Sequence, residues 1–214
     1  MPRSPRLLLL QSYYHIMTRG NNCNVVFRQD DDYWYFLDLL RKYKKLHPFD
    51  LYHYSLMPNH THMQVRTKNA PDFATFMKKL NLAYFYHYKQ KYDWVGHFWQ
   101  DRYKSQPIGK DSYFIQCGKY IELNSSRASL VKKPEDYPFS SYRYYAYGKP
   151  NNLITKDIFY DDLGKTKEKR EKNYRKLIIN ESIIVNYKQL IWGSDKQRYL
   201  ERQKISRHSI NQMN

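Results

Sequence analysis

The sequence predicts an α+β fold. It indicates a split βαβ unit whose antiparallel sheet is of the ferredoxin or RNA-recognition type, with helices on one face. Short segments that alternate polar and apolar residues, as half-buried strands do, recur along the first half of the chain. Longer segments between them repeat apolar residues at helical spacing. The resulting order is strand, helix, strand, strand, helix, strand, helix.

The first strand and the first helix have clear sequence signals. Residues 13–19 alternate and contain aromatic and β-branched side chains, which predicts a strand. Residues 25–28 are candidates for a short edge strand. The acids at positions 30–32 suit a helix N-terminus, so we expect a helix from there to about His47.

The remaining elements complete the sheet. Pro58-Asn59 form a tight turn between two alternating segments. Pro71-Asp72 suit the first turn of a long helix. We expect strands over residues 51–57, 60–66 and 97–106, and helices over residues 71–92 and 111–124.

The charge balance points to a polyanionic partner. The chain has 37 lysines and arginines against 20 acids, a net charge of +17. Such a field attracts nucleic acid first, with a membrane surface or an acidic protein as lesser options. The 23 tyrosines interleaved with these cations suit stacking on unpaired bases, although a codon bias would also enrich tyrosine and lysine.

The sequence disfavours a membrane-spanning protein, a secreted protein and a fold held together by disulfides. No stretch approaches the ~18 consecutive apolar residues that cross a bilayer. The leucine run at residues 7–10 is too short for a signal peptide. We therefore expect a protein of the cytoplasm, associated with the nucleoid. Cys23 and Cys117 are expected to be reduced, mostly buried thiols.

The periodic pattern weakens beyond Pro134. We expect one domain over residues 1–150 and a basic, mostly helical extension over residues 151–214. Residues 165–176 hold seven lysines and arginines against two glutamates, which indicates a solvated basic helix able to bind phosphates. Residues 196–214 contain little apolar material and are expected to fray.

Two histidines on the predicted strand 60–66 form the first candidate site. Positions i and i+2 of a strand face the same side, so His60 and His62 converge on one point of a polar, solvated face. Neutral imidazole is a common metal ligand, and a pair of surface histidines is the alternative. Zinc would require further ligands that the neighbouring sequence lacks. Gln64 shares this face, as an accessory ligand, a DNA contact or a solvated residue.

Tyr120 and Asn124 form the second candidate site. They are four residues apart on a predicted helix and therefore share one face. Alone, Tyr120 is best interpreted as a half-buried packing residue and Asn124 as a residue at a helix C-terminus. Their combination with the paired histidines is what suggests chemistry.

A series of segments carries a family resemblance through its order and spacing. They are Arg3-Ser4-Pro5-Arg6, Tyr14-His15 through Arg19-Gly20-Asn21, Met57-Pro58-Asn59-His60-Thr61-His62, Gln100-Asp101-Arg102-Tyr103-Lys104, Tyr120-Ile121-Glu122-Leu123-Asn124 with Arg127-Ala128, and Pro134-Glu135-Asp136-Tyr137-Pro138 with Ser140-Ser141-Tyr142. From about residue 2 to about residue 145, the chain resembles the REP-associated tyrosine transposases. These belong to the HUH superfamily of single-strand endonucleases.

The resemblance implies an HUH-type sheet with the histidines on a central strand and the tyrosine on a helix beside it. It implies that His60 and His62 are metal ligands, that Asn124 is a third, amide ligand, and that Tyr120 is the nucleophile. The implied activity is metal-dependent cleavage and strand transfer on single-stranded or hairpin DNA, through a 5′-phosphotyrosine and a free 3′-hydroxyl. Mixed nitrogen and oxygen ligands suit Mn²⁺ or Mg²⁺, and imidazole favours Mn²⁺.

Four residues on strands or strand edges are candidates for holding DNA phosphates, with ordinary surface charge as the alternative. They are His15, Arg19, Arg102 and Lys104.

The chain departs from the family pattern at three positions. Thr61 stands between the histidines where a bulky apolar residue is usual, at an expected small cost in stability. Ser125 follows Asn124 in place of proline, so the helix is expected to run on, which makes Asn124 the weaker assignment. Ser129 replaces a common glycine and is expected to affect only loop geometry.

Two other functions fit part of the pattern. A non-catalytic binder of single-stranded nucleic acid would explain the charge and the tyrosines. It would not explain His60, His62, Tyr120 and Asn124 together, and the glycine and aromatic motif of RNA-recognition domains is missing from the third strand. A replication or mobilisation nickase of the same superfamily would share the chemistry. Palindromic repeats beside the gene would favour the transposase-like function.

Overall fold

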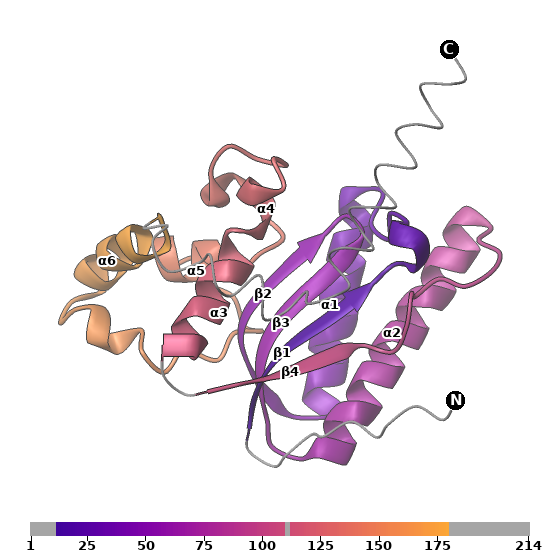
Figure 1. Cartoon of the computed structure of the whole chain (residues 1–214), viewed down its shortest axis with the longest axis horizontal. Coiled ribbons are helices and arrows are strands. Elements are labelled where there is room, and N and C mark those ends of the chain that lie inside the picture. Colours follow the sequence, from indigo (N-terminus) through magenta and orange to yellow (C-terminus); the bar gives the residue numbers. More distant parts are fainter. Residues whose placement is uncertain (1–11, 110–111, 180–214) are drawn as a thin grey trace. The chain divides into compact units, whose positions relative to one another are not determined.

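A four-stranded antiparallel sheet in the order β2-β3-β1-β4 is the centre of the molecule (Figure 1). The computed structural model describes residues 12–109 and 112–179. The sequence features at residues 3–6, 7–10 and 196–214 lie outside these residues. The strands are β1 (Tyr13–Arg19), β2 (Phe49–Met57), β3 (His60–Thr67) and β4 (Lys104–Ile108). This order and pairing confirm the predicted ferredoxin-like sheet.

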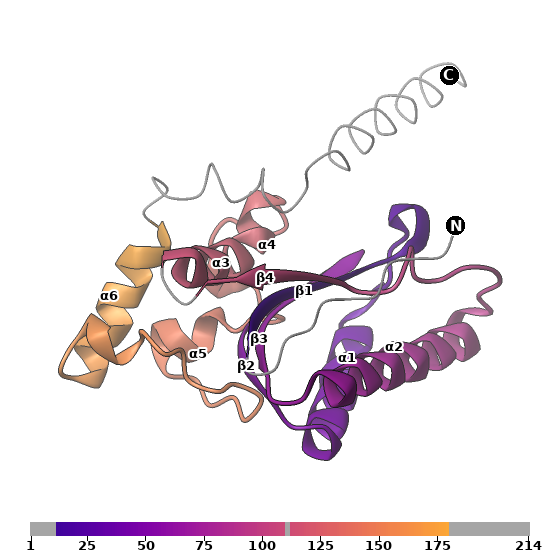
Figure 2. The same ribbon diagram turned by 60° about the horizontal axis from the view of Figure 1, so that its bottom comes forward.

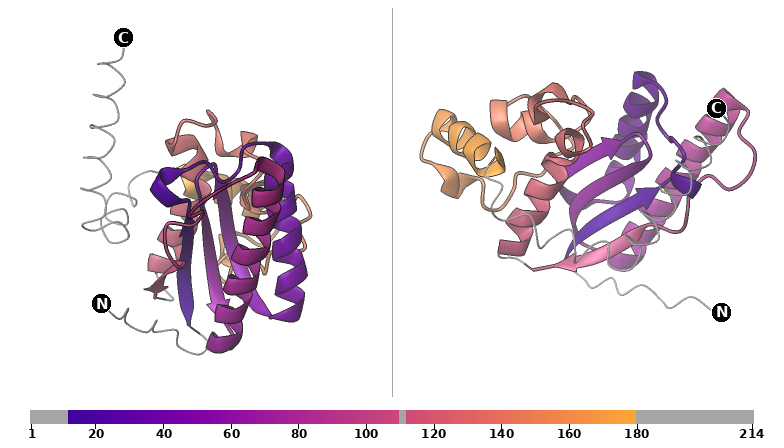
Figure 3. Two further views of the ribbon diagram at one scale, coloured as in Figure 1. Left: turned by 90° about the vertical axis from the view of Figure 1, so that its right-hand side faces the viewer. Right: turned by 45° about the horizontal axis from the view of Figure 1, so that its top comes forward.

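Helices lie on both sides of the sheet. α1 and α2 lie side by side against one face, as predicted (Figure 3). α3, which was expected on that same face, lies instead on the other side of the sheet (Figure 2). The helices are α1 (Asp30–Leu46), α2 (Ala70–Tyr92), α3 (Ser112–Glu122), α4 (Asn124–Arg127), α5 (Tyr142–Tyr147) and α6 (Lys167–Ile179). Short 3-10 helices occur at Asn21–Cys23, Pro134–Asp136 and Asp161–Leu163. Among the described residues, no helix is long and apolar enough to cross a membrane.

The two long helices begin at side-chain caps that satisfy their first amides. At α1, Gln29 and Asp32 form a reciprocal capping box. At α2, Oδ1 of Asn69 accepts the N–H of Asp72 at 3.0 Å, and Pro71 occupies the first turn. α2 ends at Asp93, which adopts a left-handed conformation with φ 49°.

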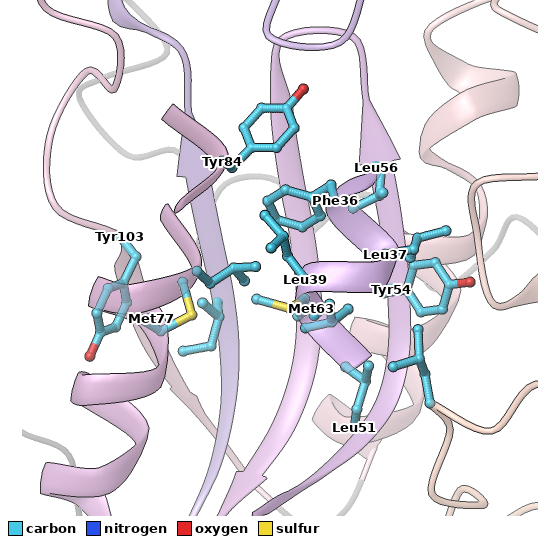
Figure 4. Close-up of a cluster of buried hydrophobic side chains, with 14 of the residues drawn as sticks. Phe36, Leu37, Leu39, Leu51, Tyr54, Leu56, Met63, Met77, Tyr84 and Tyr103 are labelled. Carbon is cyan, nitrogen blue, oxygen red and sulfur yellow. The ribbon is translucent and has the colours of Figure 1, made fainter. Parts of the chain in front are cut away.

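The hydrophobic core lies between the sheet and the helices α1 and α2 (Figure 4). Leu56 and Met63 from the strands and Phe36 and Met77 from the helices are 3% exposed or less. Each side chain of this kind contributes about 1.5–3 kcal/mol on full burial. The apolar side chains of each strand therefore fix which face of the sheet receives α1 and α2.

Two predicted strands differ from the observed ones. Residues 25–28 form no strand, because the N–H groups of Val26 and Phe27 both donate to the carbonyl of Pro58, at 2.7 and 3.0 Å. β4 begins at Lys104 instead of residue 97. The residues before it pair irregularly with the end of β1, for instance through Gln100 N–H to Arg19 O at 2.8 Å.

A buried carboxylate joins the start of α1 to the end of α2. Asp32 is fully buried and accepts hydrogen bonds from Lys91 Nζ (2.7 Å), the Tyr92 hydroxyl (2.8 Å) and the backbone N–H groups of Arg28 (2.8 Å) and Gln29 (3.0 Å). Burial by itself raises the pKa of Asp32, but these hydrogen bonds outweigh it and lower the pKa below its usual value.

Replacing Asp32 with Asn should lower the free energy of unfolding by about 2–3 kcal/mol at pH 7, because buried donors lose a charged partner. Folding lowers the pKa of Asp32, so its stabilisation is present above the unfolded value of 3.8 and is lost as the pH falls through the lower folded value. Urea denaturation of both proteins should therefore show a difference at pH 7 that shrinks in acid.

Asp38→Asn is the matched control. Asp38 is also on α1, but its side chain is 71% exposed and pairs with Arg41. We expect a change below about 0.5 kcal/mol. Equal losses in the two variants at pH 7 would contradict the role given to Asp32.

Candidate active site

The sheet face opposite α1 and α2 carries polar side chains, and α3 covers it. His15 of β1 lies directly opposite Gln64 of β3, and His62 is two residues before Gln64. α3 packs on β2 and β3. His62 and Gln64 are 0% exposed and His15 is 2% exposed. The sequence predicted a solvated face, but these side chains are buried beneath the helix.

The ring nitrogens of the histidines have defined neighbours. Nδ1 of His60 donates to Oδ1 of Asn59, because an amide oxygen can only accept, and this leaves the lone pair on Nε2. Nδ1 of His62 lies 2.8 Å from Nε2 of His15. Nε2 of His62 is buried, and within the described part of the chain it has no hydrogen-bond partner. The rings of His60 and His62 are perpendicular, with centroids 4.7 Å apart.

The three histidines are neutral at pH 7. Burial lowers the pKa of His15 and of His60 to about 3. Burial also lowers the pKa of His62 well below its usual value, and the adjacent His60 and His15 add to this. A neutral imidazole keeps a lone pair, which is the form that binds metal ions.

Tyr120 of α3 lies against these rings. Its ring centroid is 5.6 Å from that of His62 and 5.8 Å from that of His15, both in edge-to-face contact. The side chain is 3% exposed, whereas Tyr113 on the same helix is 47% exposed. Of these two tyrosines, Tyr120 is the one that the structure places beside the histidines.

Asn124 lies beyond a break in the predicted helix. α3 ends at Glu122, and α4 starts at Asn124 after Leu123, so residues 111–124 are not one continuous helix. Helical structure does continue to Arg127, as expected when serine replaces proline at position 125. The Nδ2 atom of Asn124 is buried and lacks a hydrogen-bond partner among the described residues, His60 and His62 included.

Gln64 joins β3 to α3. Its Nε2 donates to the carbonyl of Phe114 at 3.0 Å. Its Oε1 is buried and has no hydrogen-bond partner in residues 12–109 and 112–179. Gln64 therefore carries an oxygen on the same buried face as the histidines.

The candidate phosphate contacts occupy different environments. His15 is buried against His62, so a DNA strand cannot reach it in this conformation. Arg19 is partly buried, pairs with His60 in the β1–β3 register and lies with Nη2 2.9 Å from Sγ of Cys23. Arg102 and Lys104 are exposed, and Lys104 lies opposite Met17, which itself lies opposite His62.

A second buried cluster has no signal in the sequence. His53 of β2 is 1% exposed, with Nδ1 2.8 Å from Oε1 of Glu122 and Nε2 2.8 Å from Oδ2 of Asp157. Ser141 Oγ also donates to Oε1 of Glu122, at 2.7 Å. The partners are 69 and 104 residues from His53, so no local pattern could reveal them. This cluster ties α3 to β2 and to the segment that follows α5.

The charge of His53 follows from this arrangement. Burial alone lowers the pKa of His53, but hydrogen bonds to Asp157 and Glu122, together with their charges, outweigh it and raise the pKa to about 9. The imidazolium is therefore charged at neutral pH and forms an ion pair with the carboxylate of α3.

Gly118 allows α3 to approach the sheet this closely. A Cβ at this position would lie 2.9 Å from Nε2 of His53, 3.1 Å from its Cδ2 and 3.4 Å from Oε1 of Gln64. Glycine costs about 1 kcal/mol relative to alanine inside a helix. Here the missing side chain leaves room for the imidazole.

The pH dependence of stability should report on His53. Folding raises its pKa, so the stabilisation is complete below the unfolded value of 6.5 and is lost as the pH rises through about 9. We expect wild type to lose about 3 kcal/mol more than His53→Gln over this range. Chemical denaturation from pH 6 to about pH 10 measures this difference. His97→Gln, at an exposed position, should keep the wild-type profile, and parallel curves for wild type and His53→Gln would contradict the ion pair.

Comparisons with known proteins bear on the fold and the family of the chain. The family model described as IS200-like transposase matches residues 9–124. A solved structure of a REP-associated tyrosine transposase bound to a REP hairpin aligns with 18% identity and a TM-score of 0.57, over 74% of this chain and 93% of that one. A crystal structure from Deinococcus radiodurans R1, provisionally described as a transposase, aligns with 17% identity and a TM-score of 0.38, over 63% and 97%. No curated protein gives a significant match. The chain belongs to the family of IS200-like transposases.

Proposed function

We propose that this transposase is a metal-dependent single-strand DNA endonuclease and strand transferase with Tyr120 as its nucleophile. The observation that carries the proposal is the contact between the Tyr120 ring and the ring of His62, whose Nε2 is buried and lacks a partner among the described residues. A buried polar atom without a partner costs about 1–3 kcal/mol. A ligand that binds to this atom would remove the cost, so the unpaired nitrogen is a candidate ligand-binding atom.

The donor set fits a hard divalent cation better than structural zinc. His60 keeps a lone pair on Nε2, and His62 does so when its Nδ1–H donates to His15. The described residues contain no group of three or more His, Cys, Asp or Glu that could hold a metal. The further ligands would therefore be oxygens, from the amides of Asn124 and Gln64 and from the DNA phosphate. Such a mixed set suits Mn²⁺ or Mg²⁺.

In the proposed reaction, His60 and His62 would hold the metal ion and Tyr120 would attack the DNA phosphate. The bound metal would act as a Lewis acid on the scissile phosphate. The phenol oxygen of Tyr120 forms a bond to phosphorus and releases its proton, while the bond from phosphorus to the 3′-oxygen breaks and that oxygen takes up a proton. The 5′-phosphotyrosine ester conserves the bond energy, so a second 3′-hydroxyl can attack it and join strands.

Hairpin DNA is the proposed substrate. The net charge of +17 favours a polyanion, and a structurally similar transposase was solved bound to a REP hairpin. Tyr120 is 3% exposed, so a phosphate reaches it only after the covering residues move. A flexible single strand beside a hairpin enters such a site at lower cost than duplex DNA, whose bending costs several kcal/mol. We place this activity in residues 1–150, with residues 151–214 as a basic extension.

Tyr120→Phe should abolish the covalent protein–DNA adduct, because only the hydroxyl is removed. We expect a loss of at least about a thousandfold with unchanged hairpin affinity. The assay uses hairpin DNA labelled at its 3′ end, Mn²⁺ and denaturing electrophoresis. Tyr113→Phe, on the exposed part of α3, should form adduct at the wild-type level. Adduct from Tyr120→Phe, or full hairpin binding without adduct in wild type, would contradict the proposed chemistry.

The proposed metal site can be tested without catalysis. His60→Ala and His62→Ala should each weaken Mn²⁺ binding at least tenfold in calorimetry, and His15→Phe should weaken it by about 10–100-fold, because it removes the partner of His62 Nδ1. Hairpin affinity should change less than about threefold, since cations elsewhere supply most of it. His97→Ala is the control. Unchanged Mn²⁺ affinity in His62→Ala, or cleavage in excess chelator, would refute the metal site.

A further inference from the structure

A groove of about 530 Å³ lies away from Tyr120, between α1 and residues 138–153. Tyr54 of β2 lines it, and the side chain of Tyr54 belongs to the core on the α1 side of the sheet (Figure 4). Its size is in the range of pockets that hold small molecules or single nucleotides. The site around His62 uses the opposite face of the sheet.

The groove is positively charged. Arg41, Arg143 and Lys149 line it, and its described lining contains no aspartate or glutamate. The guanidinium of Arg143 is held through Nε, which donates to the carbonyl of Glu135 at 2.7 Å. Within the described chain the Nη atoms of Arg143 make no hydrogen bond, so they remain available to a phosphate. Arg41 contributes less, since it pairs with Asp38 on the same helix.

An aromatic side chain stands beside these cations. Trp34 of α1 lines the groove and is 51% exposed. Its ring is held by an edge-to-face contact with Phe139, whose centroid is 5.3 Å away. A fixed but accessible indole is a stacking platform for an unpaired base. Tyr144, also in the lining, packs edge-to-face on Tyr145 at 4.9 Å.

We propose that this groove binds an unpaired nucleotide of single-stranded DNA, with the base on Trp34 and the phosphate on Arg143 and Lys149. The inference rests on the proposed function only in taking DNA as the partner. It gives the protein a second contact with the strand, outside the site of cleavage. Phosphate contacts supply affinity, and the aromatic platform selects unpaired over paired bases.

The test uses labelled dodecathymidylate and fluorescence anisotropy at three salt concentrations. Trp34→Ala should weaken binding roughly 5- to 150-fold, and Trp34→Phe should restore much of it. Arg143→Gln with Lys149→Gln should reduce the slope of log affinity against log salt by about 0.7, because the one phosphate that the protein no longer neutralises removes about 0.7. A dodecamer carrying 5-bromodeoxyuridine should crosslink to the peptide that contains Trp34.

Matched controls lie on α2, on exposed positions away from the groove. They are Tyr86→Ala for the aromatic change and Lys78→Gln with Lys89→Gln for the charge change. Wild-type binding by the groove variants, losses no larger than in these controls, or a crosslink elsewhere would overturn the inference. The adduct assay is run on the same proteins. Absence of adduct in wild type would contradict the proposed function. The proposal for the groove would still be decided by the binding measurements alone.

Discussion

The ion pair between Glu122 and His53 fixes the position of α3, and the arrangement of the candidate site depends on it. Tyr120 is two residues before Glu122 on the same helix, so the contact that holds the carboxylate also holds the phenol. Gly118 removes the steric obstacle on the side that faces β2. The opposite charges of Glu122 and His53 attract, and Gly118 leaves room for the imidazole. The helix therefore packs directly on a polar face of the sheet.

Covering a polar face with a helix has an energetic consequence. The ferredoxin-like core needs only α1 and α2 to bury its apolar face, so α3 adds little to that core. It covers instead His62 Nε2 and Gln64 Oε1, which lack partners among the described residues. Buried polar groups without hydrogen bonds destabilise the folded state, and in native proteins they are often found at ligand-binding sites. The charged cluster around His53 offsets part of that cost.

The sequence could predict the elements whose signals are local. The alternation over residues 13–19 and the acids before α1 reflect contacts within each segment, and β1 and α1 are found where they were expected. The prediction of a strand over residues 25–28 was wrong because the amides of this segment donate to the carbonyl of Pro58. Local β-strand propensity does not include such a long-range contact. The motifs singled out His62 and Tyr120, which the fold brings together. The burial of His15 could not be foreseen, because it depends on which face receives α3.

The network around His53 also bears on how such transposases diverge. Asp157 and Tyr174, which donates its hydroxyl to Glu122 at 3.3 Å, belong to the last third of the chain, yet they complete the support of a helix near its middle. Homologues could not exchange this segment freely, because an imidazolium left with one carboxylate, or a carboxylate left with none, is costly when buried. Positions 53, 122 and 157 should therefore change together, and a chimaera that splits them would inherit a displaced tyrosine.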